Sequence, residues 1–113
     1  VSGAKALSKV LSSIGTKWQL IFGYLKTRQP AEFLNELKSI TQKIITTEIT
    51  GQENSFSSKE LFDIIQKKGI SVNKSKNLYE AIEIASQNKL NVCICGSLYL
   101  AGEFLKNNQT IPN

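Results

Sequence analysis

The stretch Trp18-Gln19-Leu20-Ile21-Phe22-Gly23 is a compact apolar run that stops at a glycine. This pattern predicts a β-strand that is covered on both faces. Before the run, apolar residues at helical spacing predict an amphipathic helix ended by Gly15, with the stripe Leu7, Val10, Leu11 and Ile14. After it, Pro30 suits the first turn of a second helix, whose inner stripe would be Phe33, Leu34, Leu37 and Ile40.

The same alternation of helix and strand continues along the chain. Short apolar or β-branched runs predict three more strands, at residues 44–47, 70–72 and 92–95. Two helices are expected to begin at capping residues, Ser57 with Glu60 and Asn77 with Glu80, and a last helix to follow the Gly96-Ser97 turn. The order αβαβαβαβα predicts an α/β, Rossmann-like fold. Its mostly parallel sheet would carry helices on both faces, as a three-layer sandwich.

Length and composition are those of one soluble globular domain spanning residues 1–113. The chain is 41% hydrophobic and 20% charged, and no apolar run is long enough to span a membrane. The N-terminus lacks the charged-then-apolar order of a signal peptide, so we expect a cytoplasmic protein. The chain contains no methionine, which suggests that it is a piece of a longer protein.

Net charge and residue types exclude several kinds of site. The formal charge is +5, but the basic residues are scattered and Arg28 is the only arginine, so nucleic-acid binding is not expected. The chain has no histidine, which removes imidazole as a base or metal ligand. Cys93 and Cys95 are too few for a zinc site and are expected to be buried strand residues. We therefore predict no metal site and assign no catalytic residue.

Ligands of open parallel sheets bind beyond the carboxyl ends of the strands. Three predicted loops lie there: residues 23–29, 48–55 and 96–97. Arg28 in the first loop is a candidate contact for a carboxylate or phosphate, and Lys26 is an alternative for the same role. Ser97 is first a helix cap and second a candidate ligand contact, since helix N-termini favour anions.

Two segments of the sequence resemble those of a known family. Residues 95–103 read CGSLYLAGE and resemble the strand-to-helix signature near the C-terminus of folylpolyglutamate synthases, where GSLYLAG or a close variant follows the last parallel strand. Residues 18–25 are similar to the same family's strand and its Gly-x-Leu loop, and Tyr79-Glu80-Ala81 fits the start of its penultimate helix. The resemblance covers essentially the whole chain.

The resemblance implies that residues 1–113 are the C-terminal, glutamate-ligase-type domain of a folylpolyglutamate or dihydrofolate synthase of the Mur ligase superfamily. Such an enzyme phosphorylates a folate carboxylate with ATP and magnesium, and the amine of L-glutamate then displaces the phosphate to form an amide. ATP and magnesium would be bound mainly by an N-terminal ATPase domain, the expected partner. No G-x-x-x-x-G-K-[ST] loop occurs in this chain, so the chain alone is expected to be inactive.

The chain departs from the family pattern in two loops. Thr27-Arg28-Gln29 stands where the family usually carries Asp-Lys-Asp, so the positive charge is kept and both acids are lost. Glu53-Asn54 lies where the family often places an arginine. Two alternatives therefore stay open. One is a folded, non-catalytic domain of the same descent. The other is an unrelated Rossmann-like binding module, although a G-x-G-x-x-G after the first strand is missing.

Overall fold

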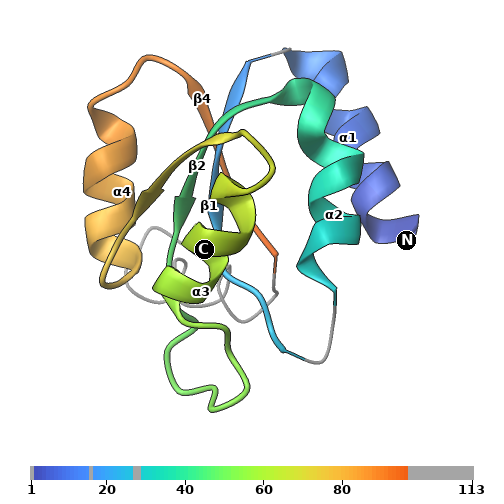
Figure 1. Cartoon of the computed structure of the whole chain (residues 1–113). Coiled ribbons are helices and arrows are strands. Elements are labelled where there is room, and N and C mark those ends of the chain that lie inside the picture. The colour runs from blue at the N-terminus through green and yellow to red at the C-terminus, as the bar shows by residue number, and fades with distance from the viewer. Residues whose placement is uncertain (1, 16, 27–28, 97–113) are drawn as a thin grey trace, which may run out of the picture.

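The computed structural model describes residues 2–15, 17–26 and 29–96, which form a four-stranded, all-parallel sheet with helices on both faces (Figure 1). The strands are β1 (Trp18–Phe22), β2 (Thr41–Thr46), β3 (Ser71–Lys74) and β4 (Asn91–Cys95). The helices are α1 (Ser2–Ile14), α2 (Pro30–Leu37), α3 (Ser58–Gln66) and α4 (Leu78–Ser86), and a 3-10 turn, η1 (Lys38–Ile40), follows α2. The predicted α/β class and alternation are confirmed, and the predicted last helix lies outside the described residues.

The sheet has the strand order β3-β2-β1-β4, so β1 and β2 are central and β3 and β4 form its edges within the described chain. β2 begins at Thr41, three residues earlier than the β-branched run suggested, because Thr41 pairs with Trp18 directly after the η1 turn. β3 likewise continues to Lys74, which pairs with Thr46. In both strands, hydrogen bonding to the neighbouring strand extends the strand over polar residues. The sequence pattern of a single segment does not predict such pairing.

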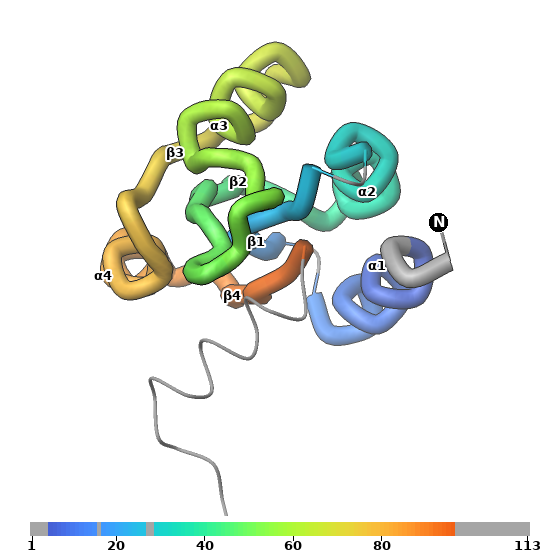
Figure 2. Tube along the Cα trace, turned by 90° about the horizontal axis from the view of Figure 1, so that it is seen from below, coloured from blue at the N-terminus to red at the C-terminus, as the bar shows by residue number. Residues whose placement is uncertain are grey.

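Two apolar cores lie on opposite faces of the sheet. Trp18, Leu20 and Phe22 of β1 face α1, α2 and α3, whereas Ile21 faces α4. Figure 2 shows α4 alone on one side of the strands and the other three helices on the opposite side. Gln19 is fully buried on the α4 side, where its Nε2 donates to the carbonyl oxygens of Ala85 (2.9 Å) and Leu90 (3.3 Å). This polar side chain inside an apolar strand thus ties the end of α4 to the sheet.

Helix α1 departs from the predicted amphipathic pattern. Leu11 is buried and Leu7 packs against the core, but Val10 and Ile14 are 57% and 66% exposed. The helix lies against α2 and η1 at the side of the sheet, so only part of its apolar stripe reaches the core. Its C-terminal end is held by Trp18, whose Nε1 donates to the Leu11 carbonyl oxygen at 3.1 Å.

The capping box predicted for α3 is confirmed. Ser57 Oγ accepts from the Glu60 amide (3.0 Å), and the Ser57 amide donates to Glu60 Oε1 (2.8 Å). At α4 the prediction was right for Asn77, which accepts from the Glu80 amide (2.9 Å), and wrong for the second arm of the box. The Glu80 carboxylate instead accepts from the amide of Lys76 (2.8 Å), one residue before the cap.

Candidate functional site

The carboxyl ends of all four strands lie along one edge of the sheet and are tied to one another by the backbone. The Thr47 amide donates to the Phe22 carbonyl oxygen (3.0 Å), and the Ser75 amide donates to that of Thr46 (2.9 Å). The Gly23 amide donates to the Cys95 carbonyl oxygen (3.4 Å). The loops that leave these strands therefore start from fixed positions along this edge.

Two of the predicted ligand loops form a joint structure. Leu25 and Ser55 make an isolated antiparallel bridge. The Lys26 amide donates to Asn54 (2.6 Å), and the amide of Phe56 donates to Tyr24 (2.9 Å). Residues 23–26 and 54–56 are therefore joined along their backbones.

Lys26, in the loop after β1, lies beside the first turn of α3. Its Nζ is 3.6 Å from Glu60 Oε2, and both side chains are about half exposed. The amide of Ser57, which donates to the Glu60 carboxylate, is the main cause that holds the pKa of Glu60 below its usual value, and Lys26 acts in the same direction. Lys26 is thus already paired with a carboxylate, which lessens its attraction for a second anion.

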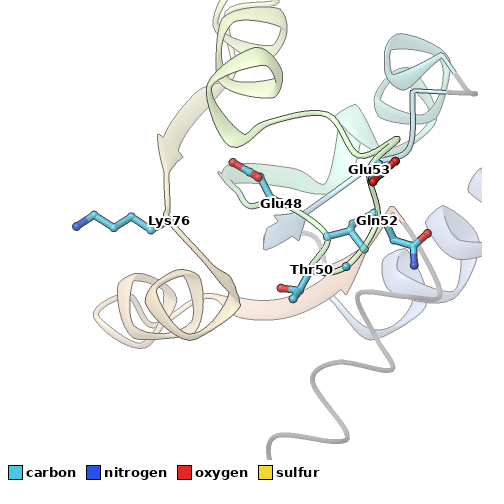
Figure 3. A pocket seen from close by; sticks show the side chains of 7 residues that line it. Glu48, Thr50, Gln52, Glu53 and Lys76 are labelled. Atoms are coloured by element: carbon cyan, nitrogen blue, oxygen red, sulfur yellow. The ribbon is translucent and has the colours of Figure 1, made fainter.

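Residues 48–53 and Lys76 line an open pocket of about 530 Å³ beyond β2 and β3 (Figure 3). The lining side chains are Glu48, Ile49, Thr50, Gln52, Glu53 and Lys76, together with the backbone of Gly51. The lining carries two carboxylates and one ammonium, a balance of −1. Figure 3 shows the Lys76 side chain extending away from the loop. The pocket is therefore better suited to a cationic or hydroxyl-rich group than to an anion.

The pocket loop is held by hydrogen bonds of its own. The Ile49 amide donates to Ser55 Oγ (3.0 Å), and the Gln52 amide donates to the Ile49 carbonyl oxygen (3.3 Å). Ile49 is buried against the α4 face, which anchors the loop to the core. Gly51 supplies the positive φ of 79° that the turn requires.

A buried hydroxyl cluster lies beneath this loop and consists of Thr46, Ser58 and Ser75. Thr46 Oγ1 lies 2.7 Å from Ser58 Oγ and donates to the Ser58 carbonyl oxygen at 2.9 Å. Ser58 Oγ and Ser75 Oγ both donate to the Thr46 carbonyl oxygen, at 2.9 and 2.7 Å. The cluster fixes the start of α3 and the β3–α4 loop against the end of β2, so it positions the pocket.

Gly96 directly follows β4 at this edge of the sheet. It has φ +102°, and a Cβ at this position would overlap with the Gly23 carbonyl oxygen. The close approach of β4 to the first loop thus requires glycine, as expected for the turn after this strand.

The structure places only one of the three predicted site residues, Lys26. Arg28 and Ser97 lie outside the described residues. Lys76 was missed by the sequence analysis, because the loop between the third strand and the Asn77 cap was not counted among the carboxyl-end loops. The same rule that selected residues 48–55 would have found it.

Within residues 2–15, 17–26 and 29–96, no group of three or more acidic, cysteine or histidine side chains could hold a metal ion. No helix in that part of the chain is long and apolar enough to cross a membrane. Cys95 is buried beside Cys93, and the hydrogen bond between the two thiols together with burial raises the pKa of Cys95.

Comparison with known proteins shows which structures this fold resembles. No family model matches the chain, and no curated protein sequence does. The structure is similar to that of Mycobacterium tuberculosis folylpolyglutamate synthase complexed with ADP, with a TM-score of 0.88 and 18% identity over 99% of this chain. It is also similar to Helicobacter pylori folylpolyglutamate synthetase, with a TM-score of 0.72 and 21% identity over 96% of the chain.

The chain spans 28% and 26% of the lengths of these two proteins. At such identities the likeness concerns the arrangement of helices and strands. This chain therefore has the fold of one part, about a quarter, of two folylpolyglutamate synthases.

Proposed function

We propose that this chain is the C-terminal domain of an ATP-dependent amide ligase that adds L-glutamate to dihydrofolate or folylpolyglutamate through an acyl phosphate. The observation that carries the proposal is the structural match over 99% of the chain to a folylpolyglutamate synthase. The signature at residues 95–102, CGSLYLAG, supports it independently from the sequence.

In this proposal the domain contributes the carboxyl edge of its sheet to an active site completed by an N-terminal ATPase domain. ATP and magnesium would be held mainly by that partner. This agrees with the absence of a G-x-x-x-x-G-K-[ST] loop from the sequence. Phosphorylation of the folate carboxylate followed by attack of the glutamate amine requires positive charge near both carboxylates.

Arg28 is the residue we assign to the glutamate or acyl-phosphate contact. Lys26, two residues earlier, is paired with Glu60 at 3.6 Å, and this pairing makes Lys26 the second choice for the same role. The pocket beside Lys76 carries Glu48 and Glu53, which would repel a glutamate carboxylate. We therefore assign glutamate to the side of the edge where residues 23–26 and Gly96 lie.

The test is an assay of the complete ligase, with its N-terminal part, for ADP formation that depends on both folate and L-glutamate. Mass spectrometry of the product should show one added glutamate per ADP. ADP formation that ignores glutamate, or a product without an added residue, would contradict the assignment.

A second function is favoured by one observation, the loss of both acids in Thr27-Arg28-Gln29. In this alternative the domain is folded and no longer supports ligation. Replacing the three residues by Asp-Lys-Asp distinguishes the two. A large gain in turnover in the replaced enzyme would favour the non-catalytic domain, whereas little change would favour a working ligase that uses Arg28.

A further inference from the structure

Strand β4 presents two thiols side by side. Cys93 and Cys95 are separated by one residue, so their side chains lie on the same face of the strand. Both are free thiols that contact the core beneath α1, α2 and α3. Cys95 is 6% exposed and Cys93 is only partly buried. Cys93 therefore keeps some exposed surface in the described structure, and β4 is an edge strand of the described sheet.

These two sulfurs are the only soft donors of the protein. The whole sequence contains two cysteines and neither histidine nor methionine. A thiophilic metal ion therefore has one place to bind on this chain. Metals that require three or four nitrogen or sulfur ligands, such as zinc, cannot complete their coordination there. A two-coordinate ion can.

The spacing of the thiols favours a bridging ion over a disulfide. Residues two apart in a strand have Cα atoms about 6.6 Å apart, near the upper limit for a disulfide and above its usual value of about 5.5–6 Å. A linear sulfur–metal–sulfur unit with bonds of about 2.3 Å spans about 4.6 Å, more than twice the length of a sulfur–sulfur bond. The ion can thus join the thiols while the strand keeps its pairing with β1.

We propose that Cys93 and Cys95 form a two-coordinate binding site for a soft monovalent metal ion of the Cu(I) and Ag(I) class. Each thiol loses its proton to solvent as its sulfur binds, so one ion adds two metal–sulfur bonds and releases two protons. No electron is transferred.

The probe is Ag(I), which needs no reductant, added to the whole chain and to the variants Cys93→Ser and Cys95→Ser. Native mass spectrometry should show one silver per chain, with a mass gain that reflects the loss of two protons. Each single variant should bind Ag(I) at least about 100-fold more weakly, because one thiolate loses the effective concentration supplied by the other. Circular dichroism and melting temperature establish that each variant is folded.

Three results would overturn the proposal. Two silver ions per chain would mean that the thiols act separately, and one silver per two chains would mean that the ion bridges copies. Unchanged affinity in either serine variant would remove the second sulfur from the site. Since the stoichiometry is measured on the unmodified chain, the proposal can be decided even where a variant does not fold.

Discussion

At the scale of single residues, Gly96 is held by two restrictions at once, one on its backbone angle and one on the space around it. Its φ is +102°, and a Cβ at this position would overlap with the Gly23 carbonyl oxygen. Gly51 and Gly69 also have a positive φ. The close contact with Gly23 arises because β4 lies beside the loop that follows β1.

We expect Gly96→Ala to lower the free energy of unfolding by about 2–4 kcal/mol, the sum of a strained backbone and an overpacked contact. Urea unfolding monitored by circular dichroism measures this change in the free energy of unfolding. Gly51→Ala is the matched control, since Gly51 has φ +79° and open space around it. Its cost should be only about 1–2 kcal/mol, the cost of a left-handed backbone for alanine. Equal losses at both positions would show that the contact with Gly23 adds nothing.

Arg28 carries the prediction on substrate binding. If the proposed function holds, Arg28→Ala in the complete enzyme should raise the apparent KM for glutamate about tenfold to a hundredfold, with a smaller effect on ATP, because a charge-assisted contact is worth about 1.5–3 kcal/mol. Lys26→Ala should have less effect on glutamate, since Lys26 is paired with Glu60. Steady-state kinetics of the two variants show which of the two side chains contacts glutamate. An unchanged KM in Arg28→Ala would make the arginine a solvated loop residue.

At the scale of single elements, the start of α3 joins the helix to the candidate site. Glu60 accepts from Ser57, caps the helix reciprocally and pairs with Lys26 of the neighbouring loop. This one carboxylate therefore holds the helix start and the loop together.

The charge of Glu60 makes this junction depend on pH. The hydrogen bond from the Ser57 amide holds the pKa of Glu60 below its usual value in the folded chain. A depressed folded pKa adds stability above the unfolded value, and that stability is lost as the pH falls through the folded pKa. Wild type should therefore be more stable than Glu60→Gln at pH 7, and the difference should shrink below about pH 4.5. Chemical unfolding at both pH values checks this, and a constant difference would contradict it.

The hydroxyl cluster at the end of β2 also joins separate elements of the fold, because it links β2 to the start of α3 and to the β3–α4 loop. Thr46→Val keeps the shape of the side chain but removes the donor to Ser58, which is 94% buried. We expect a loss of about 1–3 kcal/mol in the free energy of unfolding. Thr41→Val in the same strand removes one partly buried bond to Leu37 and should cost about 0.5–1.5 kcal/mol. A smaller loss at Thr46 than at Thr41 would rule out the cluster as a fixed unit.

At the scale of the whole molecule, the chain is the size of about a quarter of the synthases it resembles. The 113 residues alone should therefore show no folate-dependent release of phosphate from ATP, because they contain no phosphate loop. A steady-state phosphate assay on the purified chain tests this, with the complete ligase as the positive control. Sustained, folate-dependent turnover by the isolated chain would contradict both this prediction and the division of labour between the two domains.

The sequence alone determined the elements and their order, because these depend on local physics. The apolar run at residues 18–22 and the Ser57 cap with Glu60 each depend only on residues a few positions away. A parallel sheet then follows from the alternation of strands and helices.

Only the tertiary structure decided how distant segments meet. The pairing of Leu25 with Ser55, the ion pair of Lys26 and the place of Lys76 beside the acidic loop join residues that are 23 or more positions apart. The exposure of Val10 has the same origin, since it depends on where α1 lies against its neighbours. Periodicity within a segment carries no information on which other segment it will face. The packing of crossover helices on the sheet sets those contacts, and with them the geometry of the candidate site.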